Sequence, residues 1–347
     1  MMSQTRFFRA FLSRPQRLLP TSALGIVLLA YLALPLYSGE PLLAFDTFNA
    51  LQFFARLAPL VLGLGLTMFA GEFDLSIVGT YALGGMLAVQ YGGAHWVSGM
   101  AVALTAGAVI GAVQGTIVAR FNIPSMPVTL GTYIALLGLT KAISGGLSKT
   151  YDNISVTLWV DRQIAVVFSP RSLLVLGAFA VVGLILGCSR WGREIRAIGS
   201  DRRASRASGV RADRLLIGLF ATSGVLAAAS GALLNFSLGA ANPDPGTQPL
   251  ILAAVGALLG GVSLAGGRGS VAGLLAGALT VSLLAQIVTA AGLQSYLAQL
   301  FYAALLLLIV AVEAPGLHRA WTRFSVRLHS RRSADLARPI DSRKVAS

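Results

Sequence analysis

Apolar residues along this chain are gathered into ten long runs, and a polar stretch separates each run from the next. The runs lie at about residues 21–37, 51–70, 75–92, 96–119, 124–143, 171–189, 215–237, 248–265, 270–290 and 296–313. An α-helix needs about 20 predominantly apolar residues to cross the hydrocarbon core of a bilayer, and most of these runs approach that length. The pattern therefore predicts an all-α, polytopic integral membrane protein with about ten transmembrane helices.

The first run follows a basic stretch that contains four arginines and no acid within residues 1–20. This order is also that of a secretory signal peptide. The run is long, however, and no small-x-small cleavage site follows it. We therefore interpret it as an uncleaved first helix.

The composition agrees with a membrane protein: 55% of the residues are apolar and only 12% are charged. Such hydrophobicity excludes a disordered chain, and one cysteine, Cys188, excludes a disulfide-stapled secreted domain. The formal net charge of +14 would by itself suggest a nucleic-acid partner. Its meaning depends on where the charges lie.

The basic residues fall almost entirely on one side of the predicted helices. With the N-terminus inside, 22 of the 27 lie on inner segments, eight of them in residues 189–214 and eight after residue 313. Five lie on the outer side or at outer helix ends: Arg56, Lys141, Lys149, Arg162 and Arg171. Because cytoplasmic segments collect Lys and Arg, both termini are predicted to be cytoplasmic. The net charge of +14 is then explained by the predicted topology and does not require a nucleic-acid partner.

This topology divides the chain into three parts. Residues 1–20 form a basic cytoplasmic tail, residues 21–313 the transmembrane domain, and residues 314–347 a second basic cytoplasmic tail. The C-terminal tail is expected to lie along anionic membrane lipid.

Two polar interruptions occupy comparable places in the two halves of the chain. The first break (residues 70–76) contains Glu72, Asp74 and Ser76, and the second break (residues 260–270) contains Ser263, Arg268 and Ser270. Paired interruptions are expected of a transporter with two structurally related halves. Capping of the next helix and loop solvation is one interpretation of these residues; a coupling or gating role is the other.

Glycines recur every four residues on one face of two predicted helices. They are Gly107, Gly111 and Gly115 on one helix and Gly269, Gly273 and Gly277 on the other. In a bilayer, small residues at this spacing allow helix backbones to approach closely. Tight packing is the expectation for both stripes.

The chemistry of other transporter and enzyme classes is missing from the sequence. The predicted spans hold almost no Asp, Glu or His, which ion-coupled transporters usually need within the membrane. No paired catalytic cluster and no metal-ligand set is evident, so we expect neither an enzyme nor a cofactor. The closest look-alike of a Walker A motif, residues 145–150, has Ser where the motif requires Gly before Lys. Any ATP must therefore act through another subunit.

The longest inner connection, the coupling loop (residues 189–214), carries eight arginines and three acids around a few apolar positions. Its Ala, Arg and Glu favour helix, and three glycines interrupt it, so two short amphipathic helices are predicted. The loop is either a solvated stretch that fixes topology or a docking element for a soluble partner.

Four segments together resemble one family. Residues 192–210 resemble the cytoplasmic coupling loop of ribose/xylose/galactoside-type permease subunits of bacterial ABC importers. The sequence Phe-Asp-Leu-Ser at 73–76, the segment 123–132 and the glycine-rich block 258–273 resemble further signatures of that family. The resemblance covers nearly the whole membrane region in order and spacing.

The resemblance implies a permease subunit in the bacterial inner membrane that moves a sugar or sugar-like molecule inward. It further implies a second permease chain, identical or paralogous, two cytoplasmic ATPase subunits and a periplasmic substrate-binding protein. A branched-chain amino acid permease of the same superfamily and, from a different class, an ion-coupled secondary transporter are the alternatives.

The candidate site residues fall into two sets. Those expected to couple to the ATPase are Gly192, Arg193, Arg196, Ala197, Gly199, Ala204 and Gly209. Those expected at the pathway or at helix breaks are Glu72, Asp74, Ser76, Thr129, Gly131, Ser263, Arg268 and Ser270.

Overall fold

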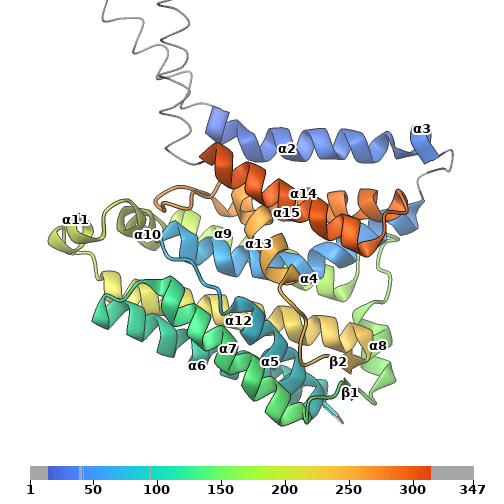
Figure 1. Ribbon diagram of the computed structural model, residues 1–347, viewed down its shortest axis with the longest axis horizontal. Helices are drawn as coiled ribbons and strands as arrows, with labels where there is room; N and C mark the ends of the chain where they lie inside the picture. Colours follow the sequence, from blue (N-terminus) through green and yellow to red (C-terminus); the bar gives the residue numbers. More distant parts are fainter. Residues whose placement is uncertain (1–14, 39–40, 42, 94, 314–347) are drawn as a thin grey trace, which may run out of the picture. The chain divides into compact units, whose positions relative to one another are not determined.

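A computed structural model of the chain describes residues 15–38, 41, 43–93 and 95–313. Nearly all of this part is helical (Figure 1). The elements are α2 (Pro15–Leu32), α3 (Leu34–Ser38), α4 (Ala44–Phe69), α5 (Ile77–Tyr91), α6 (Trp96–Phe121), α7 (Ser125–Ser144), β1 (Lys149–Thr150), α8 (Ile154–Val160), α9 (Pro170–Cys188), α10 (Arg190–Ser200), α11 (Arg202–Ala207), α12 (Ala212–Leu238), β2 (Ala240–Ala241), α13 (Gln248–Leu259), α14 (Val271–Ala290) and α15 (Ser295–Glu313).

Each predicted apolar run coincides with an apolar helix. Within the described residues, six helices are long and apolar enough to cross a membrane: α4, α6, α7, α9, α12 and α14. Shorter apolar stretches lie in α2, α5, α13 and α15. The chain is therefore a polytopic helical membrane protein.

The structure divides between Ala303 and Ala304 into two units. The geometry described below belongs to the first unit. The described part of the second is the end of α15. Of the two expected tails, residues 15–20 belong to α2, and residues 1–14 and 314–347 lie outside the described residues.

Several helix boundaries differ from the prediction, including the first, since α2 begins at Pro15 rather than near residue 21. Helix α4 begins at Ala44 rather than near residue 51, because Asp46 in its first turn accepts a hydrogen bond from the Leu43 N–H (2.9 Å). Helix α13 ends at Leu259 rather than 265, where Gly261 adopts a positive φ of 75°. The earlier start corrects the expectation for Arg56, which is the thirteenth of the 26 residues of α4 and not at a helix end.

Helix α12 packs along α4, α5 and α6 and is the centre of the core. The glycine stripe of α6 makes this possible, because a Cβ at Gly111 would lie 2.0 Å from the Phe220 carbonyl oxygen. The second stripe brings α14 against α13, where a Cβ at Gly277 would lie 2.0 Å from the Gly256 carbonyl oxygen. The predicted tight packing is confirmed at both contacts.

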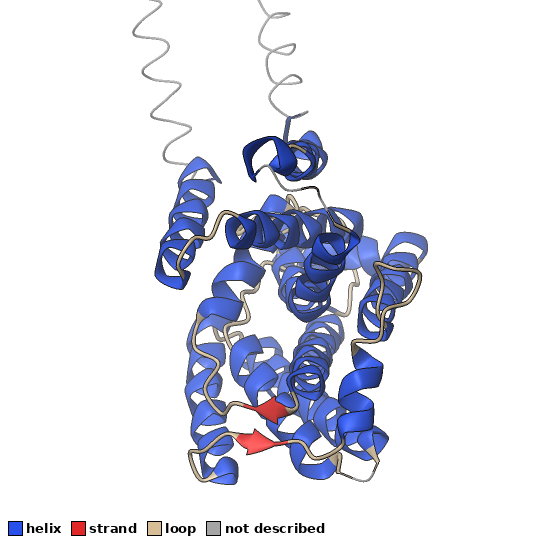
Figure 2. Cartoon of the chain, turned by 90° about the vertical axis from the view of Figure 1, so that its right-hand side faces the viewer, coloured by secondary structure: helices blue, strands red, loops and turns tan. Residues whose placement is uncertain are grey.

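Different elements lie at the two ends of the helices. At one end, β1 and β2 pair antiparallel, with Lys149 opposite Ala241, next to α8 (Figure 2). There the ring of Tyr151 packs at a tilt of 39° against the ring of Phe236 of α12, with the ring centroids 4.9 Å apart. Helices α10 and α11 lie at the other end (Figure 1).

Candidate functional site

The end of α10 meets both helix breaks through direct backbone contact. The Gly267 N–H donates to the carbonyl oxygen of Phe69, the last residue of α4 (3.0 Å). A Cβ at Gly199 would lie 2.1 Å from that same oxygen and 2.4 Å from the Gly267 nitrogen. We call this contact between α10, the first break and the second break the junction. A side chain at residue 199 would force its backbones apart.

An ion pair fastens the coupling loop to the first break. The Arg202 Nη1 lies 3.2 Å from the Glu72 Oε1, and both side chains are largely buried. The Arg202 Nη2 also donates to the carbonyl oxygen of Ala119 (3.2 Å) near the end of α6. Burial raises the pKa of the Glu72 carboxyl, while hydrogen bonding from Ser125 and the charge of Arg202 lower it. Burial likewise lowers the pKa of the Arg202 guanidinium.

Asp74 is buried and organises the turn of the first break. Its Oδ1 accepts hydrogen bonds from the Ser76 N–H (3.0 Å) and the Ser76 hydroxyl (2.6 Å). Its Oδ2 accepts from the Ser223 hydroxyl of α12 (2.9 Å). Only 1% of Asp74 is exposed, so loop solvation does not describe it. Asp74 fixes the turn before α5 and ties it to the core helix.

Helix α7 holds the first break from another side. The Ser125 hydroxyl oxygen accepts from the Phe73 N–H (3.0 Å), and the Thr129 hydroxyl lies within hydrogen-bond distance of the Phe73 carbonyl oxygen (3.3 Å). Thr129 is fully buried. Gly131 lies on an exposed face of the same helix, where a Cβ would have no other atom within 4 Å. The structure thus brings Thr129, but not Gly131, to the junction.

The polar residues of the second break mainly shape the chain locally. The Ser270 hydroxyl caps the start of α14 by accepting from the Gly273 N–H (3.0 Å). The Ser263 hydroxyl accepts from the Ala265 N–H (3.3 Å). Arg268 is exposed between these two turns.

The coupling loop forms two helices, α10 and α11, as predicted. Helix α10 is amphipathic, whereas in α11 the buried residue is Ser205 and both alanines are exposed. Ile195 and Ile198 face inward and are buried. Asp201 caps α11 by accepting from the Arg203 and Ala204 N–H groups (2.9 Å each).

The candidate coupling residues occupy two different faces of these helices. Gly192 and Gly199 face the protein, since a Cβ at Gly192 would lie 1.9 Å from the Leu186 carbonyl oxygen. Arg196 is half-buried. The outward face consists of exposed residues: Arg193, Ala197, Ala204 and Gly209. The sequence does not distinguish the two sets.

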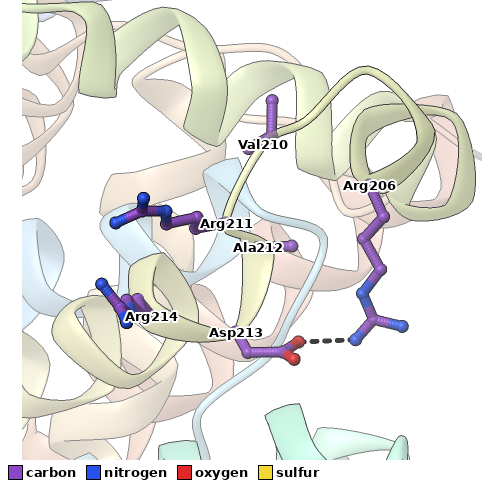
Figure 3. Close-up of a pocket in the computed structure, with 6 residues that line it drawn as sticks. All are labelled: Arg206, Val210, Arg211, Ala212, Asp213 and Arg214. Atoms are coloured by element: carbon purple, nitrogen blue, oxygen red, sulfur yellow. Dashed lines mark hydrogen bonds and ion pairs between the residues drawn. The ribbon is translucent and has the colours of Figure 1, made fainter.

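A hollow of about 390 Å³ lies where the coupling loop enters α12 (Figure 3). Arg206 and Asp213 form an ion pair on one side (2.6 Å), while Arg211 and Arg214 extend away from that pair. Three arginines against one aspartate make this part of the loop basic.

Sequence reasoning missed several residues of the junction. They are Phe69, Ser125, Arg202 and Ser223. Arg202 is one of eight arginines in its loop, and the serines are small residues in apolar helices. No local signal marks any of them, because their partners lie from 52 residues away, for Ser125 and Phe73, to 198 residues away, for Phe69 and Gly267.

Comparison with known proteins gives a consistent family. A family model described as "Branched-chain amino acid transport system / permease component" matches residues 47–310. The ribose import permease protein RbsC of Escherichia coli (strain K12) is 31% identical, over 77% of this chain and 85% of the relative. The fructose import permease protein FruF of Bifidobacterium longum is 27% identical, over 83% of each chain. The xylose transport system permease protein XylH of Escherichia coli (strain K12) is 26% identical, over 81% of this chain and 88% of the relative. No solved structure matches the chain.

Proposed function

This chain belongs to the permease-component family of bacterial ABC transport systems, and from that premise we propose that it is the membrane-spanning subunit of a sugar importer. Its relatives include permeases named for the import of ribose, fructose and xylose. They support a sugar over a branched-chain amino acid, despite the description of the family. They equally disfavour an ion-coupled secondary transporter. The protein is a multi-pass protein of the inner membrane.

The observation that carries the mechanism is the junction. Helix α10 contacts both helix breaks through Gly199, and Arg202 is ion-paired with Glu72. Close-packed backbones deform little, so a displacement of α10 shifts the ends of the helices that meet there. A soluble partner that moves the coupling loop could in this way open or close a pathway between the helices.

The partner that supplies the energy is proposed to be a separate cytoplasmic ATPase. Its contact surface would be the outward face of α10 and α11, which includes Arg193, Ala197 and Ala204. In this account the glycines of the coupling loop transmit movement inward, and the exposed residues bind the ATPase. A second permease chain, identical or paralogous, and a periplasmic binding protein complete the importer.

The proposed topology has ten transmembrane helices with both termini in the cytoplasm. The distribution of basic residues supports it, because the coupling loop carries eight arginines at one end of the helices. The opposite end, with β1, β2 and α8, would face the periplasm. Glu72, Asp74, Ser76 and Thr129 would then act at the cytoplasmic gate.

Substitutions at two exposed positions test whether the outward face of α10 and α11 binds the ATPase. We expect Ala197→Glu to reduce co-purification of the ATPase encoded with this chain by about tenfold, because it places a carboxylate in the middle of the contact. Ser148→Glu, an exposed change at the opposite end, is the matched control and should leave co-purification unchanged. Equal recovery of the ATPase with both variants would contradict the proposed docking face.

A further inference from the structure

A second polar group of residues lies away from the junction, on the half of α4 that precedes it. We call it the basic cluster: Gln52 and Arg56 of α4, Tyr81 of α5, Asp161 after α8, and Arg171 of α9. Gln52 and Arg56 are four residues apart and so lie on one face of α4. Helix α4 packs against α9, which brings Arg171 to Gln52.

Only 6% of Arg171 is exposed. Not all of its N–H groups have a hydrogen-bond partner. Its Nε donates to the Gln52 Oε1 (2.7 Å) and lies 2.8 Å from the Asp161 Oδ1. Its Nη1 and the Nε2 of Gln52 have no hydrogen-bond partner among the described residues. Buried donors without an acceptor are costly, so their presence points to an acceptor that arrives from outside the chain.

Arg56 adds a second guanidinium to the same region. It lies over the ring of Phe53, 4.0 Å from the ring centroid, and forms no ion pair with any described residue. Arg56 lies within electrostatic range of Arg171 and of the buried Tyr81. Arg56 is exposed on the surface of the described chain, in the middle of α4. A charge at such a position in a transmembrane helix is expensive and typically serves function.

The free groups of the basic cluster define what can bind there. Three of them are donors: the Arg56 guanidinium, the Arg171 Nη1 and the Gln52 Nε2. The Asp161 Oδ1, an acceptor, also has no hydrogen-bond partner, but it is ion-paired with the Arg171 Nε (2.8 Å). The basic cluster contains two guanidinium groups and one carboxylate, that of Asp161, so its net charge is a single positive charge. A carboxylate is an acceptor with one negative charge, whereas a neutral sugar hydroxyl brings a donor with every acceptor.

We propose that the basic cluster binds the carboxylate of a sugar acid, a polyhydroxylated monocarboxylate, on its way through the permease. The inference deepens the proposed function and rests on it, because it assumes that the chain passes a sugar-like solute. Arg56 pairs with the carboxylate, and Arg171 and Gln52 donate to carboxylate or hydroxyl oxygens. The position of the basic cluster, on the side of α4 away from the coupling loop, suits a solute that enters from the periplasmic end.

The test is ATP-driven uptake by the complete importer in proteoliposomes, with its own ATPase and binding protein. The probes are D-ribonate, D-xylonate and D-gluconate, each paired with D-ribose, D-xylose and D-glucose. We expect at least one acid to enter faster than its neutral parent. Arg56→Gln should lower uptake of that acid by about tenfold, the typical cost of a lost charge-assisted hydrogen bond, and Arg56→Lys should retain most of it. Arg162→Gln removes an exposed arginine outside the basic cluster and should change nothing.

The possible outcomes test the sugar-acid inference separately from the proposed function as an importer. ATP-driven uptake of neutral sugars alone, unaffected by Arg56→Gln, would overturn the sugar-acid inference and leave the importer intact. An equal loss of acid and neutral sugar in Arg56→Gln would show a structural role and would also overturn it. Uptake of the probes that is driven by an ion gradient without ATP would contradict both the inference and the proposed function.

Discussion

At the scale of single residues, the junction depends on side chains whose partners are distant in sequence. Glu72 and Arg202 are 130 residues apart, and Asp74 and Ser223 are 149 apart. The sequence marks Glu72, Asp74 and Ser76 as polar residues in an apolar chain. Nothing in the sequence indicates that Arg202 pairs with Glu72, because the pairing depends on how whole helices pack against one another.

The Glu72–Arg202 ion pair should be needed for coupling. Glu72→Gln leaves the largely buried guanidinium without its counter-charge, so we expect less sugar uptake per ATP hydrolysed. Loss of the charged hydrogen bond should also reduce the free energy of unfolding by about 1.5–3 kcal/mol. Arg202→Lys keeps the positive charge but cannot contact Glu72 and the Ala119 carbonyl oxygen at the same time, as the guanidinium does. Its uptake per ATP hydrolysed should lie between that of the wild type and that of Glu72→Gln. Wild-type coupling in Glu72→Gln, measured as uptake and hydrolysis in the same vesicles, would remove the ion pair from the mechanism.

Asp74 should make stability depend on pH with a defined sign. Burial raises the pKa of its carboxyl above the ordinary value of 3.8, against the hydrogen bonds from Ser76 and Ser223 that lower it. The folded chain therefore binds this proton more readily than the unfolded chain. The stability of the wild type relative to Asp74→Asn should rise as the pH falls from neutral through the folded-state pKa, and level off below 3.8.

Melting temperatures of the purified wild type and Asp74→Asn, compared across that range, measure this difference directly. Other titrating groups affect both proteins and cancel in the comparison. A difference that shrinks on acidification would show that Asp74 is not desolvated in the folded protein.

At the scale of elements, hydrophobic runs predict which helices exist but not where each one ends. The hydrophobic pattern predicts a start for α4 that is seven residues too late, because Asp46, Thr47 and Asn49 make its first turns look like a loop. In the structure Asp46 caps the helix, and the Thr47 hydroxyl lies 3.2 Å from the Tyr31 hydroxyl. That misplaced boundary also concealed the position of Arg56 in the middle of the helix. The spacing of the glycine stripes predicts both close contacts, because that spacing is itself the packing signal. Gly269, however, precedes α14 with a φ of 133° and does not lie on the helix.

The contact between α6 and α12 should be intolerant of a single methyl group. In Gly111→Ala the new Cβ would lie 2.0 Å from the Phe220 carbonyl oxygen, so the helices must separate. Overpacking of this kind typically costs about 1–3 kcal/mol. Gly218→Ala is the matched control on α12, where nothing lies near the added carbon. We expect a lower melting temperature for the first variant and an equal or higher one for the second; a reversed order would contradict the close approach.

At the scale of the whole molecule, the proposed topology accounts for most of the net charge of +14 without a nucleic-acid partner. Within the coupling loop, Arg202 and Arg206 are used in ion pairs with Glu72 and Asp213. The exposed arginines of the loop, among them Arg193, Arg203 and Arg211, are available to a partner. Sequence could assign the charge to one side of the helices, but only the fold separates arginines that hold the loop from those that face outward.

The central claim is that this chain conducts a sugar-like solute only when a separate ATPase moves its coupling loop. The most direct measurement is solute uptake into proteoliposomes that hold the chain alone or the chain with its ATPase and binding protein. The account predicts uptake that requires ATP and both partners and that Ala197→Glu strongly reduces. Uptake by the chain alone, driven by an ion gradient without ATP, would contradict it.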